Sequence, residues 1–291
     1  MPMTESKDQS TKPPIGCSEW SLRGIPLQEQ FQLLNEIGIS SIELGLGGNF
    51  PGHVSGTPTP EELKEVQQLS QQHQIETSFC AIESDLTGSD SNQISHELGR
   101  LKTKLSIAAQ LEVQSVNLTI SFCPTIEVDE KRLNHLTEAI QTIDIHAQEN
   151  GFRIALTTRG LVEEQCEEGD FYIETIMTNR ESLARMADSL PSNIRFAYEP
   201  GMFKAVNPSD LRLGLDIIKE RVDVCILQDW KQHNRFLQQS IIGADDLNYA
   251  TLLAHLPTTM PCLISVPPTT FPKIDLERSL EYLKRISSQS Q

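Results

Sequence analysis

The chain has 291 residues and a formal net charge of −16, because 40 Asp and Glu outnumber 24 Lys and Arg. This length fits one (β/α)₈ barrel as well as two ordinary domains. An acidic surface repels nucleic acid and anionic lipid, so neither is an expected partner. No apolar run approaches the roughly 20 residues that a membrane-spanning helix needs, so we expect no membrane segment.

The N-terminal segment and the cysteines favour a cytoplasmic location. Residues 1–14 are polar, lack the apolar stretch of a secretory signal and are expected to form a disordered tail. The six cysteines form no C-x-x-C pair, and all but Cys166 lie in or next to apolar runs. Such spacing is typical of free thiols in a reducing compartment and not of disulfides or a zinc site.

Short apolar runs alternate with amphipathic helical patterns along the chain. The runs, which are the expected strands, are Ile15–Ser18, Ser41–Leu44, Glu76–Ile82, Ser115–Ile120, Phe152–Leu156, Ile194–Tyr198, Val222–Leu227 and Cys262–Val266. The expected helices cover about 26–37, 60–73, 94–110, 129–150, 179–189, 208–220, 245–255 and 276–286. Gly38 and Gly151 are placed to end helices, and Pro60 to begin one.

These eight strand–helix units predict an α/β fold. Strands joined by helical crossovers run parallel, and eight such strands close into a single (β/α)₈ TIM barrel. An open doubly wound sheet is the alternative, but it often carries a G-x-G-x-x-G signature, which is absent after the first strand. We expect the barrel to cover residues 15–286, with tails at 1–14 and 287–291.

In such barrels, the chemistry lies at the C-terminal ends of the strands. Residues that follow an expected strand and could transfer protons are the candidate catalytic residues: Glu43, Glu199, Asp229 and His233. Candidate substrate-binding residues at the same ends are Trp20, Arg159, Trp230 and Lys231. A guanidinium such as that of Arg159 binds carboxylate or phosphate through two hydrogen bonds. Glu19 and Glu83 also follow strands, and the glycines at 45, 47 and 48 suit a tight loop without indicating a phosphate site.

Three segments at these positions resemble the xylose-isomerase-like superfamily, which includes sugar epimerases, hydroxypyruvate isomerases and inosose dehydratases. They are Ile37–Leu44, Glu199-Pro200-Gly201 and Leu227-Gln228-Asp229-Trp230. The resemblance covers essentially the whole chain after Pro14. It implies a (β/α)₈ barrel, a small polyol or keto-sugar substrate, and proton transfer between carbons next to a carbonyl. It is also compatible with a homodimer.

The same resemblance implies a divalent metal held by Glu, Asp, His and Glu, which polarises the carbonyl. The matching positions in this sequence carry other residues, namely Thr157, Glu199, Met202, Ile226 and, within one residue, Ser265. One carboxylate does not make a divalent site. We therefore predict no metal ligands and no cofactor, although Mn²⁺, Mg²⁺ or Zn²⁺ is not excluded if the loop after strand seven folds over the barrel mouth.

Three functions remain open at this point. The first is a sugar isomerase or epimerase relative that works without the usual metal. The second is a non-catalytic relative that binds a small molecule or a protein. The third is a metal-free lyase that uses His233 or Glu43 as its base. For all three, we expect Glu43, Arg159, Glu199 and Asp229 to share one cavity at the strand ends.

Overall fold

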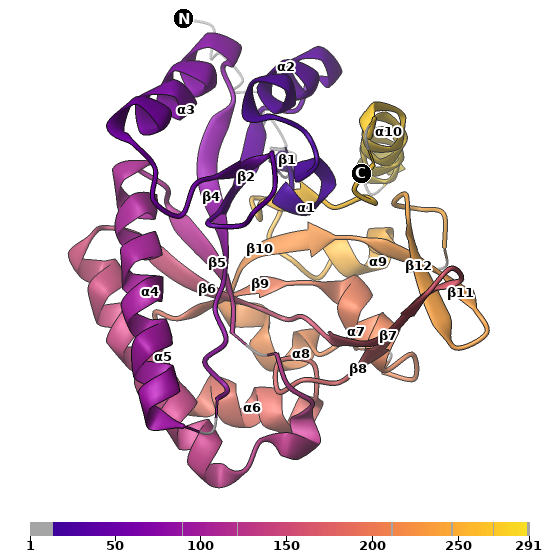
Figure 1. Cartoon of the computed structure of the whole chain (residues 1–291). Coiled ribbons are helices and arrows are strands. Elements are labelled where there is room, and N and C mark those ends of the chain that lie inside the picture. Colours follow the sequence, from indigo (N-terminus) through magenta and orange to yellow (C-terminus); the bar gives the residue numbers. More distant parts are fainter. Residues whose placement is uncertain are drawn as a thin grey trace, which may run out of the picture.

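A computed structural model describes residues 14–88, 90–120, 122–210, 212–245, 247–269 and 271–289. The tail expected at 1–14 lies outside these residues except for Pro14. Eight parallel strands close into a barrel, as predicted, because β1 pairs with both β13 and β2 (Figure 1). In chain order they are β1 (Ile15–Cys17), β2 (Ser41–Leu46), β4 (Glu76–Glu83), β5 (Ser115–Thr119), β6 (Arg153–Thr157), β9 (Arg195–Tyr198), β10 (Val222–Leu227) and β13 (Cys262–Ile264).

Helices surround the barrel. They are α1 (Glu19–Leu22), α2 (Leu27–Ile37), α3 (Pro60–His73), α4 (Ser91–Gln110), α5 (Glu130–Glu149), α6 (Arg180–Ser189), α7 (Pro200–Val206), α8 (Leu215–Ile218), α9 (Tyr249–Leu253) and α10 (Lys273–Gln289), with 3₁₀ turns η1 (Thr125–Glu127) and η2 (Lys219–Arg221). The expected helix signals act as predicted. Gly38 ends α2 in the left-handed conformation, and Thr59 caps α3 through a reciprocal pair of hydrogen bonds with Glu62.

The structure corrects three helix bounds. The helix expected over 208–220 is only α8 followed by η2, because Gly214 takes a left-handed φ of 69° and the carboxylate of Asp210 holds a turn by accepting the N–H groups of Arg212 and Gly214. The helix expected over 245–255 is reduced to α9. The last helix, α10, extends beyond residue 286 into the expected C-terminal tail.

A second, antiparallel sheet lies beside the barrel and was not predicted (Figure 1). Its strands come from the loops after β6 and β10 and are β7 (Leu161–Cys166), β8 (Gly169–Ile173), β11 (Asp229–His233) and β12 (Phe236–Ser240), in the order β11-β12-β8-β7. Tyr172, Met202 and Trp230 pack together between this sheet and α7. A short strand, β3 (His53–Val54), also extends the barrel sheet beyond β2.

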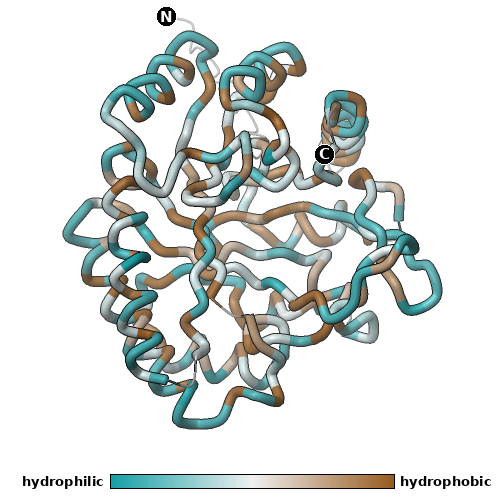
Figure 2. Tube along the Cα trace, in the orientation of Figure 1, coloured by the Kyte–Doolittle hydropathy of each residue, from teal (hydrophilic) through white to brown (hydrophobic). Residues whose placement is uncertain are grey.

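The hydrophobic core has two layers, one inside the barrel and one between strands and helices. Hydrophobic residues concentrate in the strands and on the helix sides that face them (Figure 2). The barrel interior is filled by a separate cluster: Phe79, Ala155, Ala197, Val224, Ile226 and Leu263. Because side chains alternate along a strand, residues two positions further on also point inward, and these are polar at Thr157 and Glu199. The polar layer therefore lies directly above the apolar one.

All six cysteines are free thiols, as expected, and four of them are buried in strands of the barrel. Within the part of the chain that the structure describes, no helix is both long enough and apolar enough to cross a membrane.

Candidate active site

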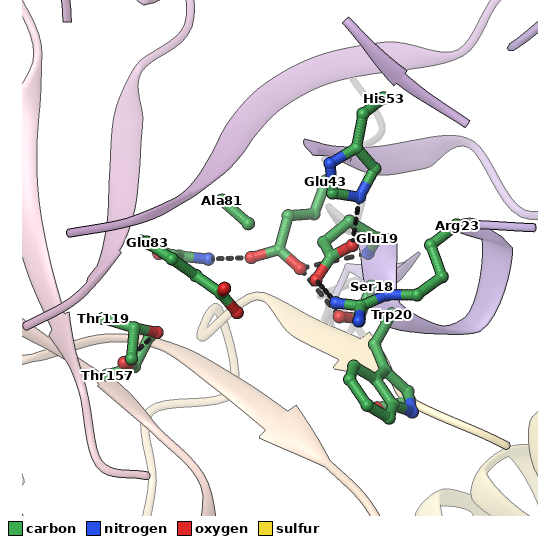
Figure 3. Close-up of polar contacts among 12 residues, drawn as sticks. Ser18, Glu19, Trp20, Arg23, Glu43, His53, Ala81, Glu83, Thr119 and Thr157 are labelled. Atoms are coloured by element: carbon green, nitrogen blue, oxygen red, sulfur yellow. Dashed lines mark hydrogen bonds and ion pairs between the residues drawn. The ribbon is translucent and has the colours of Figure 1, made fainter. Parts of the chain in front are cut away.

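A cavity of about 170 Å³ opens at the C-terminal ends of the strands. Its walls come mainly from one side of the barrel mouth, formed by β2, β4, β5 and β6, and Ile226 of β10 contributes apolar surface. The polar side chains that line it are those of Glu19, Arg23, Glu43, His53, Glu83, Lys104, Asn117, Thr119, Thr157 and Arg159. Figure 3 shows Glu43 and Glu19 side by side, with Glu83, Thr119 and Thr157 approaching from the neighbouring strands.

Glu43 is the most deeply buried carboxyl group that faces this cavity, with 2% of the residue exposed. One carboxylate oxygen accepts a hydrogen bond from the Asn117 amide at 2.5 Å. The other accepts from the Ser18 hydroxyl at 2.7 Å and from the Glu19 backbone N–H at 3.1 Å. Burial, and then the charge of Glu19, raise the pKa of Glu43 despite these three donors. Glu43 is therefore held in one orientation and binds a proton more strongly than an exposed glutamate does.

Glu19, beside it, is in the opposite electrostatic state. Its two oxygens contact His53 Nε2 at 2.8 Å and Arg23 Nη2 at 2.9 Å. Burial opposes ionisation, but the bond to His53 and the charge of Arg23 outweigh it and lower the pKa of Glu19. The Arg23 guanidinium also lies 3.9 Å from the centre of the Trp20 ring. Two adjacent glutamates thus have pKa values shifted in opposite directions, an arrangement that separates acid and base roles in enzymes.

Arg159 joins the cavity to a carboxylate buried behind it. Its guanidinium lies 3.4 Å from Glu83 and 3.4 Å from Glu199, and the latter is fully buried. Gln228 donates a further bond to Glu199 at 2.7 Å. Burial raises the pKa of Glu199, and the Arg159 guanidinium opposes that rise. For Arg159 itself, burial would lower the pKa, but the two carboxylates outweigh burial and raise it, so Arg159 remains a cation.

The structure brings together only part of the expected site. Glu43 and Arg159 share the cavity, while Glu199 contacts it only through Arg159. Asp229 does not line it: this buried carboxylate accepts the Gly243 N–H at 2.7 Å and so holds the loop after β12.

The remaining expected residues lie outside the cavity. Trp230 packs against Tyr172, with ring centres 5.1 Å apart, and therefore belongs to the small core between the antiparallel sheet and α7. Lys231 and His233 are exposed on the outer half of β11. Trp20 flanks the mouth, where its indole N–H donates to Gln239 at 2.6 Å. The expected roles of these residues in catalysis and binding therefore have no support in the cavity geometry.

Five polar cavity residues were not selected from the sequence: Arg23, His53, Lys104, Asn117 and Thr119. Asn117 and Thr119 carried a usable signal, because polar residues at alternate positions of a barrel strand face one side together. His53 and Lys104 carried none, since one follows an irregular loop and the other lies in the middle of α4.

Two glycines, Gly45 at the end of β2 and Gly48 just after it, are explained by His53. A Cβ at Gly45 would lie 2.4 Å from the His53 ring, and one at Gly48 would lie 2.3 Å from it. The ring therefore packs directly onto the backbone at the end of β2 and the start of the following loop, and its Nε2 faces Glu19. Close approach of a side chain, and not anion binding by the loop backbone, accounts for these two glycines.

The residues at the positions of the expected metal ligands do not fit a divalent ion. The Thr157 hydroxyl is hydrogen-bonded to that of Thr119 at 2.8 Å, and Ile226 belongs to the apolar layer. Ser265 is covered by the amide of Gln239, which donates to both its backbone oxygen and its hydroxyl. Among the residues that the structure describes, no group of three or more His, Cys, Asp or Glu side chains is arranged to hold a metal.

The chain has the fold of xylose-isomerase-like TIM-barrel proteins. No protein-family model and no curated protein sequence matches it. Among solved structures, a xylose isomerase domain protein from Planctomyces limnophilus is 14% identical, with a TM-score of 0.70 and coverage of 96% of this chain and 98% of that one. A probable 3-DHS dehydratase involved in petrobactin synthesis from Bacillus anthracis is 12% identical, with a TM-score of 0.71 and coverage of 93% and 98%. A D-allulose 3-epimerase from Methylomonas sp. is also 12% identical, with a TM-score of 0.69 and coverage of 95% and 98%. Identities this low establish the shared fold, and the function has to be argued from the site.

The substitution Asp229→Asn tests whether the loop after β12 depends on the charge of Asp229 or only on its hydrogen bond to Gly243. Burial raises the pKa of Asp229 to about 6, against roughly 3.9 for an unfolded aspartate. Between these values the folded state binds the proton more tightly, so the contribution of Asp229 to stability falls as the pH rises through that window. Asparagine removes the charge and can still accept the Gly243 N–H. We expect the variant to be more stable by about 1–2 kcal/mol near pH 7.5, with the difference vanishing near pH 4.

Urea unfolding of the two proteins at these pH values measures the difference. A variant that is less stable than the wild type near pH 7.5 would show that the charge itself holds the loop, and would contradict this account.

Gly45→Ala tests the packing of the His53 ring. The added methyl group has to displace the ring and with it the contact between His53 and Glu19, which should destabilise the fold by about 1–3 kcal/mol. Gly99→Ala is the matched control, because nothing lies within 4 Å of a Cβ at this helical position. There alanine should stabilise by about 0.5–1 kcal/mol. Equal unfolding midpoints for the two variants would refute the packing argument.

Proposed function

We propose that the chain is an enzyme that moves a proton between carbons next to the carbonyl of a small polyol-derived ketose, as sugar isomerases and epimerases do. Glu43 is the acid–base group in this proposal, and Arg159 stabilises the charge that develops on the carbonyl oxygen. The observation that carries the proposal is a buried glutamate of raised pKa that faces a small polar cavity.

The properties of Glu43 suit a base that takes a proton from carbon and returns it. A catalytic group is most effective when its pKa lies near the working pH, and both burial and Glu19 raise the pKa of Glu43 toward that range. Bonds from Ser18 and Asn117 fix the carboxylate. When Glu43 accepts the proton, the substrate becomes an enediolate. For isomerisation, the same carboxyl group then donates the proton to the neighbouring carbon, while the hydroxyl proton of the enediolate passes from one oxygen to the other. For epimerisation, it returns the proton to the original carbon on the opposite face after the substrate turns, and neither reaction needs a co-reactant.

The size and polarity of the cavity suit a small hydroxylated ligand. At roughly 30 Å³ for each molecule of liquid water, its volume corresponds to about six waters. Hydroxyl and amide groups of Asn117, Thr119 and Thr157 line the side next to Glu43. Solved structures of the same fold include a D-allulose 3-epimerase in complex with D-allulose. A small ketose is therefore the substrate class that we propose.

Arg159 provides the positive charge that this chemistry needs. An enediolate carries negative charge on oxygen, and a fixed donor at that point is commonly worth about 10²–10³ in rate. Arg159 lines the cavity and is held in place by Glu83 and Glu199. We propose that it replaces the metal that the sequence resemblance implies, because the residues at the metal positions lack the necessary donors.

A non-catalytic binding protein is the alternative, and one observation favours it. Thr157 and Ser265 stand where the resemblance places the two glutamates that exchange protons with substrate, and neither hydroxyl has an activating base among its contacts. If Glu43 only binds a ligand hydroxyl, the fold would retain a sugar site without the reaction. The test of Glu43 separates these two functions.

Solvent exchange of substrate protons tests the catalytic proposal without knowledge of the product. We expect the wild type to replace the proton next to the carbonyl with deuterium in D₂O when it is given a panel of small ketoses, as monitored by ¹H NMR. Glu43→Gln keeps most of the hydrogen bonds but removes the base and should lower the exchange rate by about 10²–10⁴. Exchange should rise with pH through the raised pKa of Glu43, because only the ionised form accepts a proton.

The control for this experiment is Glu65→Gln, the same chemical change at an exposed position of α3. It should exchange protons at the wild-type rate. Ligand binding by the wild type without exchange of any ketose proton would favour the non-catalytic alternative.

The metal proposal has its own measurement. After dialysis, elemental analysis should find far less than one equivalent of Mn, Zn or Fe, and proton exchange should be unchanged by EDTA. The carboxylates of Glu19, Glu43 and Glu83 are already bonded to other side chains, and the neutral hydroxyls beside them would leave an ion mostly hydrated and weakly bound. Near-stoichiometric metal that is lost in Glu199→Gln would overturn the replacement of metal by Arg159.

A further inference from the structure

A second cavity of about 590 Å³ adjoins the first one at the outer side of β2. The two share five lining residues, which are Gly47, Gly48, Phe50, His53 and Lys104. The second cavity is further lined by Arg100 and Thr103 of α4 and by the loop that follows β3. The two cavities are therefore neighbours, and a ligand that spans both would pass Lys104.

Lys104 lies at the boundary between the two cavities without a carboxylate partner among the described residues. Its ammonium group donates to the backbone oxygen of Glu83 at 3.2 Å, and no ion pair within 4.0 Å involves it. The side chain passes close to Gly47, where a Cβ would lie 2.8 Å from Lys104 Cε. Burial, followed by the charge of Arg100, lowers the pKa of Lys104, and the charges of Glu97 and Glu83 oppose this shift without reversing it. The fold thus holds a partly buried cation in a position where its own charge is disfavoured.

Arg100 adds a second positive charge one helical turn before Lys104. Residues four apart lie on the same helix face, and both side chains line the second cavity. Arg100 is anchored to Glu97 at 2.8 Å. The carboxylate among the lining residues is that of Glu62, which is occupied in the cap of α3, where it accepts the Thr59 N–H at 2.7 Å. Two cations therefore face this cavity, and its one carboxylate is already engaged.

The position of Lys104 beside Arg100 stands out against the negative net charge of the whole chain. At −16, the protein has carboxylates in excess, yet among the described residues those nearest to Lys104, Glu97 and Glu83, act on it only from beyond 4.0 Å. A cation that is partly removed from water and lies near another cation is unfavourable unless an anion offsets it. Glu97 and Glu83 offset this charge in part, and an anion in direct contact with the ammonium group would have to come from a bound ligand.

We propose that the second cavity binds an anionic group of the substrate, a carboxylate or a phosphate, with Lys104 as its principal partner and Arg100 at its rim. This inference rests on the proposed function, because it places the carbonyl end of the same molecule beside Glu43. It narrows the substrate class from neutral ketoses to keto-acids of polyols or ketose phosphates. The reaction that supplies such a substrate is then an oxidation to the acid or a phosphorylation.

Binding of three matched polyols tests the proposal independently of any turnover. The probes are D-glucitol, which is neutral, D-gluconate, which carries a carboxylate, and D-glucitol 6-phosphate. Isothermal titration calorimetry should show that the wild type prefers at least one anionic probe to D-glucitol by about tenfold or more, as expected for one charge-assisted hydrogen bond. The ranking of the two anionic probes then distinguishes carboxylate from phosphate.

The variants identify the residue responsible. Lys104→Gln should abolish the preference for the anionic probe, while Lys104→Arg, which keeps the charge, should retain it. Lys102→Gln is the matched control, because it removes the same charge from an exposed position of α4 that does not line the cavity, and it should bind like the wild type. Circular dichroism confirms that each variant is folded.

Two results would overturn the proposal. One is equal affinity of the wild type for the neutral and the anionic probes. The other is an unchanged anion preference in folded Lys104→Gln. Either result can occur while Glu43-dependent proton exchange on neutral ketoses persists, so failure of the anion site is distinguishable from failure of the proposed function. Conversely, anion binding that depends on Lys104 without any proton exchange would support the site and reject the enzyme.

Discussion

The ion pair between Arg159 and Glu199 determines how the barrel mouth is arranged. A fully buried carboxylate is costly without a compensating charge, and the guanidinium provides it from the loop after β6. Gln228 satisfies a second position on the same carboxylate. These bonds fill the barrel mouth at the ends of β9 and β10. Gln239 likewise covers Ser265, which follows the last strand. The accessible polar surface is therefore confined to the side formed by β2, β4, β5 and β6. The cavity lies there because the other side of the mouth is filled.

The antiparallel sheet is what closes that other side. Its two hairpins replace plain loops after β6 and β10, and Tyr172 and Trp230 of the sheet pack against Met202 of α7, which joins the sheet to the helix that follows β9. Gln239 of β12 contacts both Trp20 and Ser265, so the sheet reaches the ends of the first and last strands. Asp229, at the start of β11, holds the returning loop through Gly243. Asp229 and Trp230, whose positions after a strand predicted a catalytic or binding role, therefore hold the antiparallel sheet in place over the barrel mouth.

The barrel was predictable because its strands are short apolar runs at regular intervals, and closure buries both faces of each strand. Glu43 and Arg159 were predictable by the rule that strand ends carry the site. The rule could not distinguish Glu43 from Asp229, since position after a strand does not determine whether a carboxylate faces the cavity or a loop. Lys104 was beyond sequence reasoning, because a lysine on a helix usually faces solvent. The hairpins were missed because their polar, partly exposed strands lack an apolar run, as in the segment 161–166.

Replacement of a metal by a guanidinium would lower the positive charge beside the carbonyl oxygen, and the other residues of the site would have to compensate for it. A divalent ion brings two charges and exchangeable ligand positions, whereas Arg159 brings one charge, shared with Glu199 and Glu83. The enediolate would receive weaker stabilisation, and a stronger base would be needed to reach it. Glu43 is such a base, because its burial and the negative charge of Glu19 both raise its affinity for a proton. A second cation close by at Lys104 would then bind the distant end of the substrate and leave Arg159 available for the carbonyl. The three features form one consistent electrostatic arrangement, in which positive charge is spread over two fixed side chains where the resemblance implies a single ion.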